Sequence, residues 1–206
     1  MISNPRANTR AAELFGVFLL SLAAGPASGG TNVTPLEIGV PLPALRGERL
    51  DGRPSVLPDS SLGTAFVLLL GFSYESRHDV EAWAARYRAD FGPRPAIACF
   101  EVPVIGGAAR LARPFIDRGM RRGTPRELHD RVITVYRDAG EWKRRLRFTA
   151  PDVAYVLLID RAGRVAWRTQ GPLGDAVYGE LATLIRALGS EGAPERANPP
   201  DNAAPR

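Results

Sequence analysis

Apolar residues in the middle of the chain occur in two patterns, short unbroken runs and helical stripes. Residues 64–72 (TAFVLLLGF) form an unbroken run that is too short for a helix, which predicts a strand buried on both faces. One stripe at helical spacing follows, made of Val80, Trp83, Ala84, Tyr87 and Phe91. Gly92 and Pro93 end this predicted helix, and Ser76 with Asp79 form a weak capping-box pattern at its start.

The next region predicts a second parallel strand and a basic, partly helical segment. Residues 95–105 form the strand, with Cys99 near its centre. Residues 106–123 are rich in arginine, and Pro114 must lie in the first turn of any helix there. A further strand is expected within residues 129–138, and a short helix within residues 141–148.

The clearest pattern lies near the end of the folded region. Residues 154–160 (AYVLLID) form an apolar run, residues 161–163 a tight turn, and Val165 and Trp167 then alternate with polar residues, which predicts a β-hairpin. A closing helix over residues 175–188 would bury Ala176, Leu181, Leu184, Ile185 and Leu188. The crossovers require parallel neighbours, whereas the hairpin is antiparallel. We therefore expect an α/β fold with a mixed sheet flanked by helices and a helical basic insertion.

The two ends of the chain differ from its middle. Arg6 and Arg10 precede a short apolar run (14–24), and small residues follow, which predicts a signal peptide or N-terminal anchor over residues 1–27. We expect a linker at 28–40, one domain at 41–188, and a disordered, proline-rich tail at 189–206. The protein is then exported, to the periplasm or outside the cell, or held at a membrane; a transit peptide is the other interpretation.

Charge is unevenly distributed. The 206 residues carry 27 Lys and Arg against 22 Asp and Glu, a net charge of +5. Residues 106–148 hold twelve basic and five acidic side chains, a local excess of +7. The predicted basic surface contains Arg110, Arg113, Arg118, Arg121, Arg122, Lys143, Arg144 and Arg145. It suits an acidic protein surface or anionic lipid headgroups, or is merely solvated; nucleic acid is not expected, because no interleaved aromatic residues provide a stacking platform there.

The strand, loop and helix of residues 68–83, together with the late hairpin, resemble the thioredoxin-like superfamily over about residues 41–188. In its thiol-active members, the loop carries a cysteine pair or one peroxidatic cysteine at the helix N-terminus, where the dipole lowers the thiol pKa. Here Ser76 and Asp79 stand at about the two thiol positions, and Ala154 stands where those members have a cis-proline, with Pro151 three residues earlier. The resemblance therefore implies the fold without its usual redox chemistry.

Two further segments are similar to one branch that lacks both features, the mitochondrial ATP synthase assembly factors. Residues 154–160 are followed by residues 163–167 (GRVAW) and Gly171, which match a strand ending in Asp, a turn and a basic-Trp strand. Residues 75–83 also resemble the first helix of those proteins, with its Trp. An unnamed exported relative would fit the same residues, so this resemblance implies a binding or assembly role and names no partner.

The candidates for chemistry are the single cysteine and the two histidines. Cys99 is the only cysteine, which excludes an intramolecular disulfide, and its place within a strand favours a buried core residue over a nucleophile. His78 lies close to Glu75 and Asp79, and His129 is the only other histidine, yet such short polar clusters are more often solvated loops than metal sites. We expect no catalytic residue, no metal and no cofactor.

We therefore predict a redox-inactive, thioredoxin-like binding domain of the assembly-factor or chaperone type, acting as a monomer. Its expected contact loop contains Ser73, Tyr74, Glu75, Ser76, Arg77, His78 and Asp79. The alternative is a one-cysteine peroxidase or thiol oxidoreductase that uses Cys99, and metal delivery is a third class.

Overall fold

The computed structural model describes residues 33–190 apart from residues 62 and 94. The predicted signal peptide lies outside these residues, and so does the predicted tail from residue 191 onward, whereas residues 189 and 190 end the last helix. No helix among the described residues is long and apolar enough to span a bilayer.

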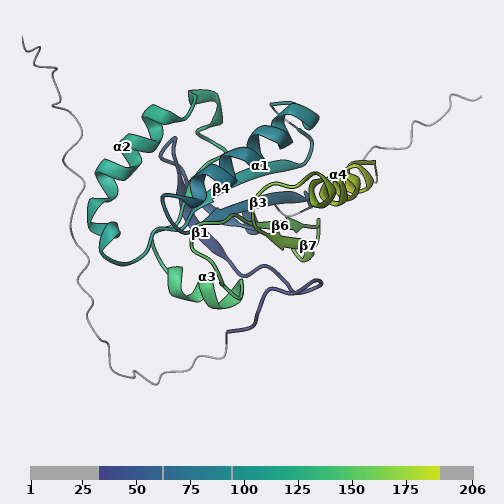
Figure 1. Ribbon diagram of the computed structural model, residues 1–206, viewed down its shortest axis with the longest axis horizontal. Coiled ribbons are helices and arrows are strands. Elements are labelled where there is room, and N and C mark those ends of the chain that lie inside the picture. The colour runs from purple at the N-terminus through teal and green to yellow at the C-terminus, as the bar shows by residue number, and fades with distance from the viewer. Residues whose placement is uncertain (1–32, 62, 94, 191–206) are drawn as a thin grey trace, which may run out of the picture. The chain divides into compact units, whose positions relative to one another are not determined.

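A four-stranded mixed sheet forms the centre of the domain, in the order β4-β3-β6-β7 (Figure 1). Strand β3 (Phe66–Gly71) is buried along its whole length, pairs in parallel with β4 (Ala98–Pro103) and pairs antiparallel with β6 (Tyr155–Ile159). The turn after β6 leads into β7 (Val165–Gln170), the antiparallel edge strand. The predicted buried strand, parallel crossover and hairpin are confirmed.

A second, three-stranded sheet contains a hairpin that the sequence did not predict. Strand β1 (Leu45–Arg49) pairs antiparallel with β2 (Pro54–Leu57) and with the short strand β5 (Ile133–Thr134). Parallel bridges from Glu101 to Val132 and from Val104 to Val135 join this sheet to β4. A short 3₁₀ turn, η1 (Asp59–Ser61), follows β2.

Helices α1 (Ser76–Phe91) and α4 (Asp175–Ser190) pack together against one face of the central sheet. The predicted α1 stripe is confirmed for its first four members, which are buried, while Phe91 is half-buried. The predicted α4 stripe is partly wrong: Ala176 is exposed and Leu184 is at the margin of exposure, whereas Tyr178 and Ala182 are buried. The buried face follows the helical period from Tyr178 through Leu181 and Ile185.

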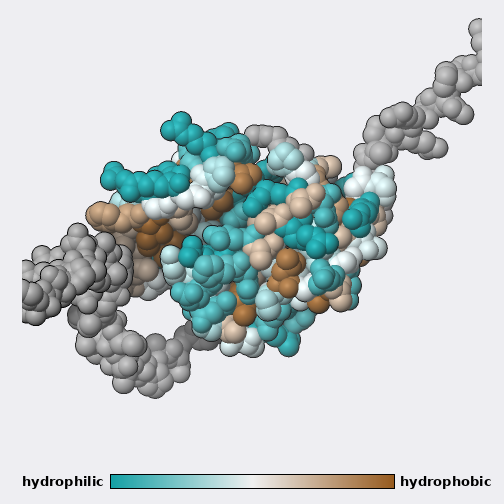
Figure 2. Space-filling model, turned by 45° about the horizontal axis from the view of Figure 1, so that its top comes forward, coloured by the Kyte–Doolittle hydropathy of each residue, from teal (hydrophilic) through white to brown (hydrophobic). Residues whose placement is uncertain are grey.

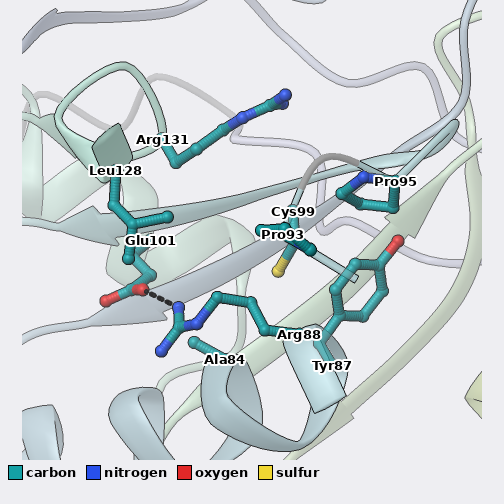
Figure 3. Close-up of a pocket in the computed structure, with 9 residues that line it drawn as sticks. All are labelled: Ala84, Tyr87, Arg88, Pro93, Pro95, Cys99, Glu101, Leu128 and Arg131. Carbon is teal, nitrogen blue, oxygen red and sulfur yellow. Dashed lines mark hydrogen bonds and ion pairs between the residues drawn. The ribbon is translucent and has the colours of Figure 1, made fainter. Parts of the chain in front are cut away.

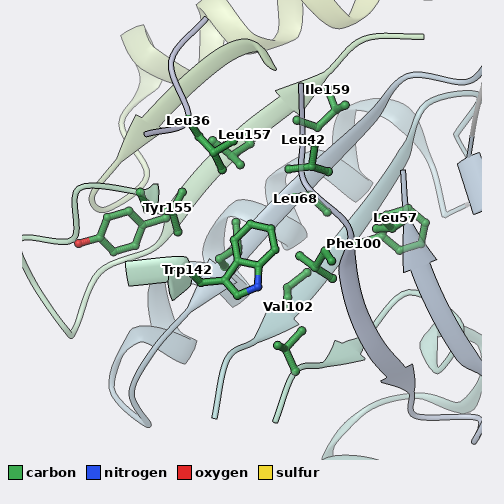
Figure 4. Packing of buried hydrophobic residues seen from close by; sticks show 14 of the residues in the cluster. Leu36, Leu42, Leu57, Leu68, Phe100, Val102, Trp142, Tyr155, Leu157 and Ile159 are labelled. Atoms are coloured by element: carbon green, nitrogen blue, oxygen red, sulfur yellow. The ribbon is translucent and has the colours of Figure 1, made fainter. Parts of the chain in front are cut away.

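The other face of the sheet is covered by the β1–β2 hairpin, helix α3 (Ala139–Arg145) and the segment before β1 (Figure 4). Trp142 of α3 packs here with Leu68 and Leu157. Leu36 is fully buried in the same cluster, and its N–H donates to Arg145 O at 2.8 Å. The prediction of a linker is therefore wrong from residue 33 onward, because Leu36 belongs to the core of the domain.

The basic segment folds as the 3₁₀ turn η2 (Gly107–Ala112), helix α2 (Arg113–Gly123) and the 3₁₀ turn η3 (Arg126–Leu128). Pro114 lies in the first turn of α2, as expected. The only buried residue of α2 is Asp117, so this helix rests on the surface of the domain. In Figure 1, α2 lies at the left of the domain and α4 at the right.

Candidate functional site

The loop between β3 and α1 closes on itself through two serines. Ser73 Oγ accepts the N–H of Ser76 at 3.0 Å, while Ser76 Oγ accepts the N–H of Ser73 at 3.1 Å and donates to Ser73 O at 2.9 Å. The N-cap of α1 is Glu75, which makes no side-chain capping bond, so the predicted capping role of Ser76 is wrong; Ser73 Oγ accepts the first N–H of the helix instead. Ser76 is also fully buried, since Gly71 leaves room for it, so it cannot belong to the predicted contact surface.

Two carboxylates tie this loop to the segment that precedes β6. Ser73 Oγ donates to Asp152 Oδ1 at 2.8 Å, and Asp79 Oδ2 accepts the N–H of Ala154 at 3.3 Å. Ala154 thus lies beside the start of α1, where the resemblance placed it. The one cis peptide bond among the described residues joins Leu57 to Pro58. The segment at Ala154 therefore lacks the cis-proline that thiol-active members carry there.

The exposed part of the loop presents an aromatic ring and charged groups. Tyr74 is 71% exposed, and the Arg77 guanidinium lies 4.3 Å from the centre of its ring. His78 Nε2 lies 3.9 Å from a Glu75 carboxylate oxygen, and both side chains are exposed. These residues form a polar surface around one solvent-facing tyrosine.

Beside this loop lies an aromatic cluster, defined here as Phe72, Phe148 and Tyr155, that sequence reasoning missed. The ring centres lie 5.2 Å apart for Phe72 and Phe148, and 5.6 Å apart for each of them and Tyr155. Lys143 Nζ lies 4.5 Å above the Phe148 ring. No local pattern marks these residues as neighbours, because they come from three separate segments.

The hydroxyl of Tyr155 holds the segment between α3 and β6 in place. It accepts the N–H groups of Thr149 and Ala150 at 2.9 and 3.1 Å, and it donates to Ala150 O at 3.0 Å. A single buried side chain therefore orders the backbone that borders both the aromatic cluster and the α1 loop.

Cys99 lies away from this loop. It pairs in register with Val67, whereas Gly71, next to the loop, pairs with Pro103. Cys99 therefore lies four residues along the strand from the loop end, a distance of about 13 Å. Cys99 lines a cavity of about 20 Å³, space for a water molecule, together with Tyr87 and Arg88 (Figure 3). Burial, and next the neighbouring Glu101 carboxylate, raise the pKa of its thiol.

The surroundings of Cys99 are themselves held by polar contacts. Arg88 Nη1 donates to Glu101 Oε1 at 3.0 Å, and the Tyr87 hydroxyl donates to Ile97 O at 2.6 Å. Burial raises the pKa of Glu101 in spite of the nearby Arg88. The thiol lies among apolar groups, the Glu101 carboxylate and two arginines, and the effects of burial and of the carboxylate prevail, which disfavours the thiolate needed for nucleophilic attack.

The predicted basic surface divides into two parts, one on η2 and α2 and one on α3. On α2, Arg113 pairs with Glu48 at 2.6 Å and Arg121 Nε donates to Leu50 O at 2.7 Å, so both bind the domain. On α3, Arg145 pairs with Glu141, and Lys143 covers the aromatic cluster.

The remaining predicted basic residues are solvent-exposed, and no ion pair engages them among the described residues: Arg110, Arg118, Arg122 and Arg144. His129 Nε2 lies 3.0 Å from Thr124 O. Within the part of the chain that the structure describes, no group of three or more His, Cys, Asp or Glu side chains is arranged to hold a metal ion.

The central mixed sheet, the loop leading into α1 and the late hairpin define a thioredoxin-like fold. Among solved structures, the chain is similar to BsSco, a member of the Sco family of cytochrome c oxidase assembly proteins, with a TM-score of 0.53 and 11% identity over 75% of this chain and 97% of that one. It is also similar to a protein from Chlorobium tepidum described as thiol:disulfide interchange protein DsbE, with a TM-score of 0.50 and 15% identity over 73% and 99% of the chains. At these identities the likeness concerns the fold.

A third structure, an uncharacterized conserved protein from Geobacillus kaustophilus, has a TM-score of 0.50 and 16% identity over 74% of this chain and 84% of that chain. No protein-family model matches the sequence, and no curated protein matches it.

Proposed function

We propose that this protein is a thioredoxin-fold binding module without thiol redox activity, which acts in the assembly or chaperoning of other proteins. The observation that carries the proposal is the closed hydrogen-bonded loop of Ser73 and Ser76, with Asp79 bound to Ala154, at the place where this fold carries its thiols. Serine and aspartate side chains cannot take part in thiol–disulfide exchange. Their hydrogen bonds make the loop a rigid platform.

The surface around this loop suits a protein partner. Tyr74 projects into solvent beside Arg77, and the aromatic cluster with Lys143 borders the same loop. Tyrosine and arginine are enriched among the residues that contribute most to protein–protein binding, because each combines a large contact area with a polar group. A rigid loop that displays such residues loses little entropy on binding.

An assembly role agrees with two likenesses. The similar structure BsSco belongs to a family of cytochrome c oxidase assembly proteins, and residues 154–171 resemble the mitochondrial ATP synthase assembly factors. The amino-terminal sequence pattern at residues 1–27 supports export, which would place the module in the periplasm or outside the cell. We propose that the module acts there as a monomer, on a protein partner with an acidic surface or at an anionic membrane surface.

A one-cysteine peroxidase or thiol oxidoreductase is the second candidate. It is favoured by one observation, that Cys99 opens on a water-sized cavity that Arg88 and Arg131 also line. Two guanidinium groups would favour a thiolate, but burial and Glu101 outweigh them and raise the thiol pKa.

The enzymatic test compares the full chain with its Cys99→Ala variant in insulin reduction and in peroxide consumption. We expect both proteins to give the uncatalysed rate, and we expect a thiol reagent at neutral pH to label Cys99 only after denaturant is added. Turnover by the parent protein that disappears in Cys99→Ala would overturn the proposal and establish the thiol enzyme.

The binding test introduces a photo-crosslinking residue at Tyr74, at the centre of the proposed surface, and at Thr183, an exposed position on α4, as the matched control. We expect a discrete crosslinked protein from position 74 only, and its loss when Arg77→Ala is added. Equal crosslinking from both positions would show that the loop is not the contact surface.

A further inference from the structure

Two large apolar side chains project into solvent from the basic segment. Leu111 at the end of η2 is 89% exposed and Phe115 in the first turns of α2 is 77% exposed. They are the most exposed of the large hydrophobic residues that the structure describes. They lie four positions apart along one continuous helical segment, so both side chains can contact the same external surface.

Within the helical stretch that carries these two side chains, every exposed charged residue is an arginine. The stretch Gly107–Gly123 contains five arginines and one carboxylate, Asp117. That carboxylate is buried, accepts a hydrogen bond of 2.6 Å from the Tyr136 hydroxyl and pairs with Arg113. It therefore offsets little of the positive charge that faces solvent.

The arginines of this stretch have two different roles. Arg113 and Arg121 face the domain, where they bind Glu48 and the Leu50 carbonyl. Arg110, Arg118 and Arg122 are exposed, and no ion pair engages them within the described part of the chain. The inner arginines attach the helix to the domain, and the outer ones, which form no ion pair there, lie on the same helical segment as Leu111 and Phe115.

We infer that η2 and α2 form a membrane-docking surface, with Leu111 and Phe115 entering the interface of an anionic lipid bilayer and Arg110, Arg118 and Arg122 binding its headgroups. Basic amphipathic helices bind bilayers in this way, through buried apolar area together with attraction to anionic lipids. This inference concerns a different surface from the α1 loop and stands independently of the function proposed above.

The size of the patch favours a bilayer over an acidic protein. Phe and Leu side chains together offer on the order of 400 Å² of contact area, about half of what one partner contributes to a stable protein interface. The open hollow beside α2 is lined by Arg118 and Arg122, among others, but by neither Leu111 nor Phe115. Figure 2 shows hydrophobic side chains interspersed with hydrophilic ones on one face of the domain. A fluid bilayer requires no matching shape, so two projecting side chains with flanking cations suffice.

The test is co-sedimentation of the full-length protein with phosphatidylcholine vesicles, with and without phosphatidylglycerol. We expect retention only on the anionic vesicles, and less of it as salt is raised. The double variant Arg118→Ala/Arg122→Ala should weaken the partition constant roughly 30-fold. Leu111→Ser/Phe115→Ser should weaken it about 10-fold or more.

Matched controls place the same changes elsewhere on the domain. Ile38→Ser replaces another apolar side chain, which is 67% exposed, and Arg137→Ala/Arg186→Ala removes two exposed arginines outside α2. Both controls should bind as the parent does, and unfolding midpoints verify that every variant is folded.

Three results would overturn the inference. These are equal retention on neutral and anionic vesicles, parent-like binding by both α2 variants, and binding to soluble polyglutamate without binding to vesicles. The last result would identify an acidic polypeptide as the partner of this surface instead.

Discussion

The hydroxyl of Tyr155 gives the sharpest test of how the site is ordered. The substitution Tyr155→Phe keeps the ring, which is buried within the aromatic cluster, and removes one oxygen. That oxygen accepts two backbone N–H groups, from Thr149 and Ala150, and donates to the Ala150 carbonyl. The variant therefore leaves three backbone groups without their protein partner.

The expected loss of stability depends on how accessible these backbone groups are to water. An orphaned buried polar group costs about 1–3 kcal/mol. Thr149 is exposed and Ala150 only half-buried, so water replaces part of the loss, and we expect the free energy of unfolding to fall by about 2 kcal/mol. For a domain of this size that lowers the midpoint of thermal unfolding by about 4–8 °C.

The assay is urea unfolding followed by circular dichroism, with backbone hydrogen exchange as a second measurement. Tyr74→Phe is the matched control, because its ring is exposed, and we expect its free energy of unfolding to lie within about 0.5 kcal/mol of the parent. Exchange at residues 149 and 150 should accelerate in Tyr155→Phe alone. Equal stability of the two variants, with unchanged exchange, would refute the assigned role of the hydroxyl.

Three further changes test the packing around the α1 loop and Cys99. Gly71→Ala should lower the free energy of unfolding by about 1–3 kcal/mol in urea titrations, because its Cβ would lie 2.7 Å from Ser76 Oγ; a neutral effect would contradict that packing. Asp79→Ala should cost about 1 kcal/mol, and Asp79→Asn clearly less, since the amide oxygen can still accept the N–H of Ala154; equal losses would count against this hydrogen bond. Burial raises the folded-state pKa of Glu101 above its ordinary value of 4.5, so the unfolded chain releases this proton first as pH rises. The free energy of unfolding of the parent relative to Glu101→Gln should therefore fall as pH rises from 4.5 through the raised pKa of Glu101. An increase in this difference over the same pH range would show that the pKa is lowered instead.

The sequence predicted well those elements whose buried residues follow a regular spacing along the chain. Strand β3 is covered on both faces, so every residue from Phe66 to Leu70 must be apolar, and the run is visible in the sequence. Helix α1 covers one face, so its buried residues recur at helical spacing. The turn after β6 is equally local, because Asp160 Oδ1 accepts the N–H groups of Ala162 and Arg164.

The elements that were missed or misplaced carry weak local patterns. In β1 (LRGER) only Leu45 is buried. Strand β5 can approach β1 because Gly47 has no side chain; a Cβ there would lie 2.5 Å from Ile133 Cγ2. In α4 the apolar residues lie on more than one side of the helix. The choice of Tyr178 and Ala182 over Ala176 and Leu184 depends on the angle at which α4 meets α1, which no local pattern encodes.

For the candidate site, the sequence alone determined the inventory of groups. It excluded a disulfide within the chain and placed serine and aspartate, rather than thiols, around the start of α1. It also located the positive charge in residues 106–148.

Only the tertiary structure decided which of these groups meet and which face solvent. Ser76 is buried, Asp79 binds a backbone 75 residues away, and Phe148 reaches Phe72 across the loop. The basic residues divide into those that hold α2 to the domain and those that project from it. Such contacts join distant segments through sheet pairing and helix packing, so residue type and spacing along the chain do not specify them.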